Sequence, residues 1–117
     1  MEPKEKPLIT VVEHPNYLKR AESLLTQEQM DEIADMLAVD PDAGDVMQGC
    51  GGCRKLRYAG VPAKGKSGGM RVIHLFVTGD QEVHLLDIYG KAEKNNLTKA
   101  ERNALASLAA ILKGTRS

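Results

Sequence analysis

Apolar and polar positions follow two different patterns along the first forty residues. Residues 8–12 form a continuous run of apolar and β-branched side chains, which predicts a buried strand. Apolar positions then recur at helical spacing, first at Leu18, Ala21 and Leu25, and again at Met30, Ile33, Ala34 and Leu37. Thr26 and Gln29 have the spacing of a capping box, so a second helix is expected to begin there and to end before Pro41.

The second half of the chain predicts three strands and one helix. Residues 54–59 are a short strand candidate. Apolar and β-branched side chains are frequent in residues 69–77 and 82–89, and Gly79-Asp80 predicts a hairpin between these two segments. Thr98 and Glu101 form another capping box, which opens an amphipathic helix. The order strand, two helices, three strands, helix predicts an α+β fold. We expect a small antiparallel or mixed sheet of about four strands, with the helices packed on one face.

Composition bounds the class of protein. A chain of 117 residues is expected to form a single domain, here residues 8–117, behind a flexible arm at residues 1–7. No apolar run reaches the roughly 20 residues of a membrane span, and the charged beginning lacks the apolar stretch of a signal peptide. Two cysteines are too few for a disulfide framework. These features predict a cytoplasmic protein.

A net charge of zero hides strong segregation of charge. Residues 1–45 carry 11 acidic and 4 basic side chains, residues 46–79 carry 6 basic and no acidic ones, and residues 80–117 carry 5 acidic and 6 basic ones. The middle third therefore creates a local positive field that suits a polyanionic partner. A solvated basic surface without a partner is the alternative interpretation.

The six central cations are expected to converge in space. They are Arg54, Lys55, Arg57, Lys64, Lys66 and Arg71. Lys55 and Arg57 share strand parity and so point to one face, Arg71 opens the next strand, and the two remaining lysines lie in the connecting loop. This arrangement predicts a groove that binds phosphate, although no Walker-type lysine motif is present.

Lys91 follows the last predicted strand and can join the same end of the sheet. Cleavage of RNA through its 2′-hydroxyl needs a base, positive charge for the transition state and an acid for the leaving oxygen. A lysine among like charges loses its proton more readily, so Lys91 is a candidate base or acid. Asp87 and Tyr89 have the same parity; the alternatives for them are charge pairing on the sheet and packing under the last helix.

Cys50 and Cys53 form a Cys-Gly-Gly-Cys sequence. It permits three interpretations: a zinc site, a redox-sensitive pair before Arg54, or two small side chains in a tight turn. The three histidines, His14, His74 and His84, have no paired spacing, which disfavours zinc. His74 and His84 are expected on strand faces, with a part in proton transfer as the alternative.

The glycines and cations of this region form a pattern similar to a known family. It runs through Gly44-Asp45-Val46, Gly49, Gly51-Gly52, Arg54-Lys55-Leu56-Arg57, Lys64-Gly65-Lys66, Gly68-Gly69 and Arg71-Val72-Ile73, and continues at Leu85 to Glu93, Asn96-Leu97-Thr98 and Glu101. Over residues 8 to about 112 the chain resembles the RelE/ParE superfamily of type II toxins, in particular its HigB-like branch. It departs from that pattern at Cys50 and Cys53, where relatives typically carry Thr and Leu or Val.

The resemblance implies an mRNA interferase, that is, a ribosome-dependent endoribonuclease that cleaves translated mRNA without a metal or other cofactor. It also implies neutralisation by a cognate antitoxin, which is HigA-like and has a helix-turn-helix domain. The toxin would then contact DNA only indirectly, through this antitoxin. The implied catalytic residues are Lys55, Arg57, Arg71 and Lys91, and the implied RNA-binding residues are Arg54, Lys64 and Lys66. For Arg54 an ion pair stays an alternative. The alternative function is a non-catalytic module of the same fold that binds RNA, the ribosome or a protein.

Overall fold

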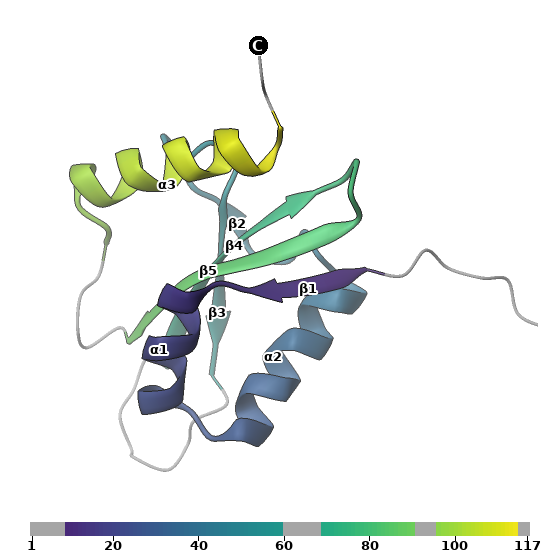
Figure 1. The fold of residues 1–117 in the computed structure, drawn as a ribbon. Helices are drawn as coiled ribbons and strands as arrows, with labels where there is room; N and C mark the ends of the chain where they lie inside the picture. Colours follow the sequence, from purple (N-terminus) through teal and green to yellow (C-terminus); the bar gives the residue numbers. More distant parts are fainter. Residues whose placement is uncertain (1–8, 60–68, 91–95, 115–117) are drawn as a thin grey trace, which may run out of the picture.

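Three helices and five strands make up the residues that the computed structural model describes, 9–59, 69–90 and 96–114 (Figure 1). In chain order they are β1 (Thr10–Glu13), α1 (Pro15–Leu24), α2 (Gln27–Val39), β2 (Asp45–Val46), β3 (Arg54–Tyr58), β4 (Met70–Val77), β5 (Glu82–Gly90) and α3 (Lys99–Leu112). The predicted arm, residues 1–7, lies outside these ranges. Within them, no helix is both long and apolar enough to cross a membrane.

The strands form one mixed sheet in the order β1-β5-β4-β3-β2. β1 runs parallel to β5, and the other neighbours are antiparallel. The predicted α+β fold with a mixed sheet is confirmed. The sheet has one strand more than expected, because Asp45 and Val46 pair with Lys55 and Arg54. A strand of two residues is too short to leave a periodic signal in the sequence.

Both predicted capping boxes are present. The Thr26 hydroxyl accepts from the backbone N–H of Gln29 at 3.1 Å, and the Gln29 side chain accepts from the Thr26 N–H at 2.9 Å. Thr98 and Glu101 make the same two bonds, at 3.1 and 2.8 Å, at the start of α3. These bonds fix where α2 and α3 begin.

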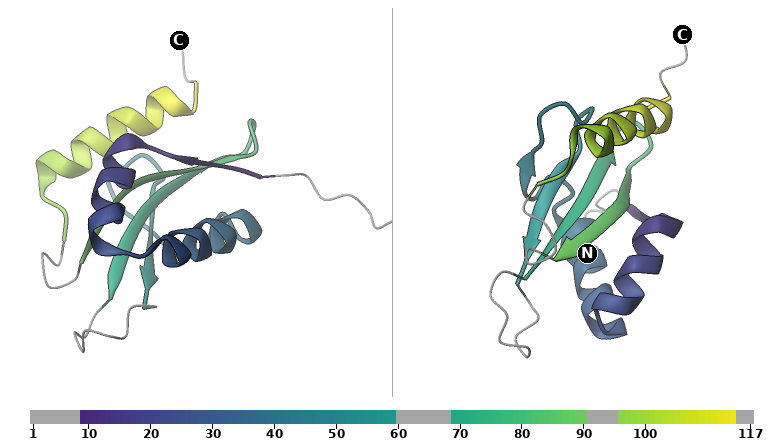
Figure 2. Two further views of the ribbon diagram at one scale, coloured as in Figure 1. Left: turned by 60° about the horizontal axis from the view of Figure 1, so that its bottom comes forward. Right: turned by 90° about the vertical axis from the view of Figure 1, so that its left-hand side faces the viewer.

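The helices cover both faces of the sheet, not one face as the sequence predicted (Figures 1 and 2). Val72 and Phe76 of β4 belong to the core beneath α1 and α2, whereas Ile73 and Leu75 belong to a second core with α3. Apolar side chains at both parities of β4 require a cover on each face. The sheet is therefore the middle layer of three, and the face toward α3 is the one that concerns the candidate site.

A register shift between β4 and β5 changes which side chains of β5 point to each face of the sheet. Ile73 is paired with Asp87 and His74 with Leu85, so Leu86 is an extra residue in β5. Such a bulge changes the face to which the following side chains point. As a result Leu85 packs beneath α1 and α2, while Leu86 and Tyr89 pack beneath α3.

Candidate functional site

Strand β3 divides its cations between the two faces of the sheet. Leu56 and Tyr58 pack into the core beneath α1 and α2, so the alternate residues Lys55 and Arg57 leave the strand on the α3 side. Lys55 is opposite Ile73, which belongs to the α3-side core. The structure thus places Lys55 and Arg57 on one face, as their strand parity predicted.

Arg71 joins these two side chains from the next strand. It is opposite Arg57 in the β3–β4 register and opposite Tyr89 in the β4–β5 register. Directly opposed residues of antiparallel strands have Cβ atoms about 5 Å apart, and like charges in that position destabilise the sheet. Arg71 is 8% exposed and Arg57 is exposed. We call Lys55, Arg57 and Arg71 the cationic face; its crowding favours a bound anion.

Two carboxylates, those of Asp45 and Asp87, lie on the strands next to these cations. Asp45 is opposite Lys55 in the β2–β3 register. Among the described residues, neither Lys55 nor Arg57 has a carboxylate partner within 4.0 Å. Asp87 is held by the Arg20 guanidinium of α1, with 3.2 Å between Oδ1 and Nε, which is the charge pairing considered for it.

Arg54 points to the opposite face. Its Nη1 donates to the Gly44 carbonyl at 3.0 Å, and its Nε lies 3.6 Å from Asp42 Oδ1. Gly44 has a positive φ of 94°, and a Cβ there would lie 2.5 Å from the Lys55 carbonyl oxygen, so the turn requires glycine. Of the two roles left open for Arg54, the structure contains the ion pair.

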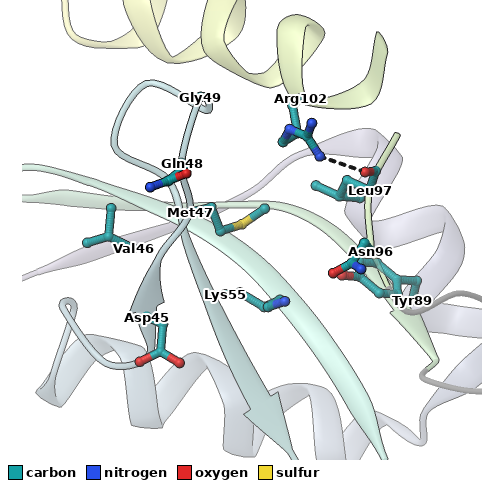
Figure 3. A pocket seen from close by; sticks show the side chains of 10 residues that line it. All are labelled: Asp45, Val46, Met47, Gln48, Gly49, Lys55, Tyr89, Asn96, Leu97 and Arg102. Atoms are coloured by element: carbon teal, nitrogen blue, oxygen red, sulfur yellow. Dashed lines mark hydrogen bonds between the residues drawn. The ribbon is translucent and has the colours of Figure 1, made fainter. Parts of the chain in front are cut away.

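A cavity of about 650 Å³ opens beside the cationic face (Figure 3). Its lining comes from the β2 segment, from β3 and β5, and from the chain around the start of α3. The lining residues are Asp45, Val46, Met47, Gln48, Gly49, Lys55, Tyr89, Asn96, Leu97 and Arg102. Lys55 extends toward Tyr89 and Asn96 in this view. Tyr89 is fully buried in the α3-side core, the packing role considered for it.

Arg102 is a cavity residue that the sequence analysis missed. It lies one turn into α3, and its Nη1 donates to the Leu97 carbonyl at 2.9 Å. One feature of the sequence could have pointed to it: Arg102 comes four residues after Thr98, so it lies near the N-terminus of α3, which the capping box holds in place. Asn96 and Gln48 could not be predicted as cavity residues either, because their segments are far apart in the sequence and only the fold brings them together.

The remaining predicted cations, Lys64, Lys66 and Lys91, lie outside the described residues. Their roles stay predictions.

The histidines lie away from the cationic face. His74 is fully buried on the α1/α2 side, and its Nε2 is 2.8 Å from the Ala43 carbonyl oxygen. Burial lowers the pKa of His74. His14 Nε2 and His84 Nδ1 share a hydrogen bond of 2.8 Å, and His84 Nε2 is 3.1 Å from Glu82 Oε1. Burial, and then the neighbouring His84, lower the pKa of His14.

Cys50 and Cys53 are fully buried free thiols beneath α3. Burial raises the pKa of Cys50, against the opposing effect of the Arg102 guanidinium, and raises that of Cys53 to about 11. Thiols that stay protonated at neutral pH are poor nucleophiles and metal ligands. The arrangement is that of two small side chains packed in a tight turn. No group of three or more His, Cys, Asp or Glu residues suited to a metal ion occurs in the described ranges.

Comparison with known proteins agrees with this architecture. No family model matches the sequence. Among solved structures, the free state of an Escherichia coli RelE toxin mutant, with two arginines replaced by alanine, superposes with a TM-score of 0.58 at 14% sequence identity. The match covers 87% of this chain and 97% of the RelE chain. The chain therefore has the RelE-like fold that the sequence resemblance implied.

Proposed function

We propose that this chain is the toxin of a type II toxin-antitoxin pair, of the HigB-like branch, and that it cleaves translated mRNA on the ribosome. A cognate antitoxin, HigA-like with a helix-turn-helix domain, neutralises it. The opposed pair Arg57 and Arg71, next to Lys55 on one face of a RelE-like sheet, is the observation that carries this proposal. Two adjacent guanidinium groups offset their mutual repulsion when a phosphate lies between them.

The proposed reaction is attack of a ribose 2′-hydroxyl on the adjacent phosphorus. The bond from phosphorus to the 5′-oxygen breaks, which leaves a 2′,3′-cyclic phosphate and a 5′-hydroxyl. Negative charge builds up on the non-bridging oxygens in the transition state, where Arg57 and Arg71 stabilise it. Lys55 binds the adjacent phosphate. Lys91 takes the proton from the nucleophile or gives one to the leaving oxygen.

Inducible expression in a bacterium tests the nuclease proposal. Primer extension on a translated reporter mRNA should reveal new 5′ ends together with growth arrest for the wild type. Arg57→Ala should reduce cleavage about a hundredfold, as expected for loss of one donor to a developing oxyanion. Because Arg57 is exposed, its substitution leaves the fold intact. Arg71→Ala should act in the same direction, with its folding checked by circular dichroism because Arg71 is buried.

Lys19→Ala, which removes an exposed cation of α1, is the matched control and should cleave like the wild type. One observation favours the alternative of a binding module: no histidine belongs to the described part of the cationic face. A folded wild-type protein that binds ribosomes or RNA without producing new 5′ ends would establish that alternative and exclude the nuclease.

A further inference from the structure

The cavity beside the cationic face is larger and chemically more varied than a phosphate requires. Its volume of about 650 Å³ falls in the range of pockets that hold small organic molecules, roughly 300–1,000 Å³. A phosphate needs only cations and N–H donors. Here Lys55 and Asp45 supply charged groups at one end, while the opposite part of the lining combines apolar side chains with the guanidinium of Arg102.

Met47 and Leu97 form an apolar surface in this opposite part. Both belong to the α3-side core, Leu97 fully packed and Met47 at its margin, and they extend toward one another in Figure 3. A flat ring can lie on such a surface and lose contact with water. The surface adjoins the phosphate-binding cations, so a nucleotide bound to them has its base within reach of it.

Arg102 stands over this surface in a fixed position. Its Nη1 donates to the Leu97 carbonyl at 2.9 Å, and that carbonyl directly precedes the capped start of α3. A guanidinium has five N–H donors, so most remain for a ligand. Asn96, exposed on the same wall, adds an amide that both donates and accepts. Paired donors of arginine match the O6 and N7 acceptors of guanine.

We propose that this cavity binds one unstacked guanine base of single-stranded RNA, with Arg102 and Asn96 contacting the base edge and Met47 and Leu97 its ring face. The flanking phosphates lie on Lys55, Arg57 and Arg71. The inference rests on the proposed function, because it requires that the cationic face bind RNA. It adds a base preference that phosphate contacts alone cannot give.

Fluorescence anisotropy with the purified full chain tests the proposal. The probes are labelled oligouridines whose central position is guanosine, adenosine, 7-deazaguanosine or abasic. The central guanosine should bind about tenfold more tightly than the others, the discrimination expected of a bidentate contact. Arg102→Lys keeps the positive charge but loses the two parallel N–H donors of the guanidinium, so it should abolish the preference for guanosine. The affinity for plain oligouridine should stay within about twofold of the wild-type value.

Lys19→Arg is the matched control, because it also exchanges one cation for another. Lys19 is exposed on α1, on the other face of the sheet, so this variant should leave the guanosine preference unchanged. Equal affinity for all four probes would overturn the guanine site while leaving RNA binding intact. Failure to bind any probe would overturn both this site and RNA recognition by the isolated chain. A preference that persists in Arg102→Lys would also contradict the assignment.

Mapped 5′ ends from cells provide a second measurement. If the nuclease proposal holds, guanosine should be enriched at one fixed position relative to the cut, and Arg102→Lys should flatten that enrichment while cleavage continues. Cleavage without any base enrichment in the wild type would refute the guanine site alone. The two experiments therefore separate failure of this inference from failure of the proposed function.

Discussion

At the scale of single residues, two buried tyrosines of one core differ by a hydrogen bond. The Tyr58 hydroxyl donates to Glu32 Oε1 at 2.5 Å, whereas the Tyr17 hydroxyl has no hydrogen-bond partner among the described residues. Tyr58→Phe should lower the free energy of unfolding by about 1 kcal/mol. Tyr17→Phe removes a buried hydroxyl without a bond and should leave stability unchanged or raise it. Urea unfolding of both variants measures the difference, and equal losses would contradict the assigned bond.

The same hydrogen bond predicts a pH dependence. Burial and the bond to Glu32 raise the pKa of Tyr58 from 10 to about 12. Because the folded-state pKa is raised, this stabilisation is complete below pH 10 and is lost as the pH rises toward 12. The stability gap between the wild type and Tyr58→Phe should therefore close over that window. A gap that stays constant up to pH 12 would argue against this origin.

Acid should destabilise the fold through its histidines. The pKa values of His14 and His74 are lowered in the folded chain, so the unfolded chain takes up protons first as the pH falls below 6.5. Stability is complete above that value and decreases below it, by at most about 1.4 kcal/mol per imidazole and pH unit. Urea unfolding at pH 7.5 and 5.5 measures the loss, and His14→Gln should reduce it. Equal stability at the two pH values would be inconsistent with the lowered pKa values of His14 and His74.

Residue types alone predicted part of the site. Strand parity was sufficient to place Lys55 and Arg57 on one face, because their spacing of two residues determines it. The partner of Arg54 could not be predicted in the same way, since it depends on the turn at Gly44 and on Asp42. Arg102 was missed for a related reason: it reaches the cavity only because α3 packs on the same face as the cations.

At the scale of elements, the two capping boxes offer a matched test of how α3 supports the site. Thr26→Ala and Thr98→Ala remove the bond that the threonine hydroxyl accepts at the start of α2 and of α3, while the backbone N–H of the same residue can still donate. Each substitution should cost about 1 kcal/mol of stability. Only Thr98→Ala should weaken the guanosine preference, because fraying of the first turn of α3 releases Arg102. Thermal unfolding and anisotropy with both variants measure the two effects. A weakened preference in Thr26→Ala as well would point to general loosening of the fold.

Elements with a long periodic signal were predictable, and those that depend on pairing were not. The capping boxes and the apolar spacing located α2 and α3. The two residues of β2 become a strand only because β3 is beside them. The extra residue Leu86 in β5 is likewise a property of the register with β4. The prediction that the helices pack on one face of the sheet was wrong, because β4 carries apolar side chains on both of its faces and each face has a helical cover.

At the scale of the whole molecule, segregated charge along the chain becomes segregated charge in space. The exposed acidic residues of α2 lie on one side of the sheet, and the cationic face lies on the other; these acidic residues include Glu28, Asp31, Glu32 and Asp35. A molecule with zero net charge can therefore still present one positive side to a polyanion. The electric field of these charges also orients the protein as it approaches a polyanion, because phosphate groups repel its acidic side.

This separation predicts how RNA binding responds to salt. Three phosphate contacts, at Lys55, Arg57 and Arg71, imply that log K falls with log salt with a slope of about −2 for single strands. Affinity for oligouridine should thus drop roughly 20-fold between 50 and 200 mM salt. Arg57→Ala should make the slope shallower by about 0.7, because one of the three cation–phosphate contacts is lost.

Asp35→Asn on the acidic side is the control for this salt dependence. Its side chain lies on the far side of the sheet from the cationic face, and at 150 mM salt exposed charges are screened beyond about 8 Å. The variant should therefore keep the slope of the wild type, although it raises the net charge by one unit, whereas Arg57→Ala lowers it by one. A steeper slope in Asp35→Asn, opposite to the change in Arg57→Ala, would mean that overall charge governs RNA binding. A change confined to Arg57→Ala would locate the phosphate contacts on the cationic face.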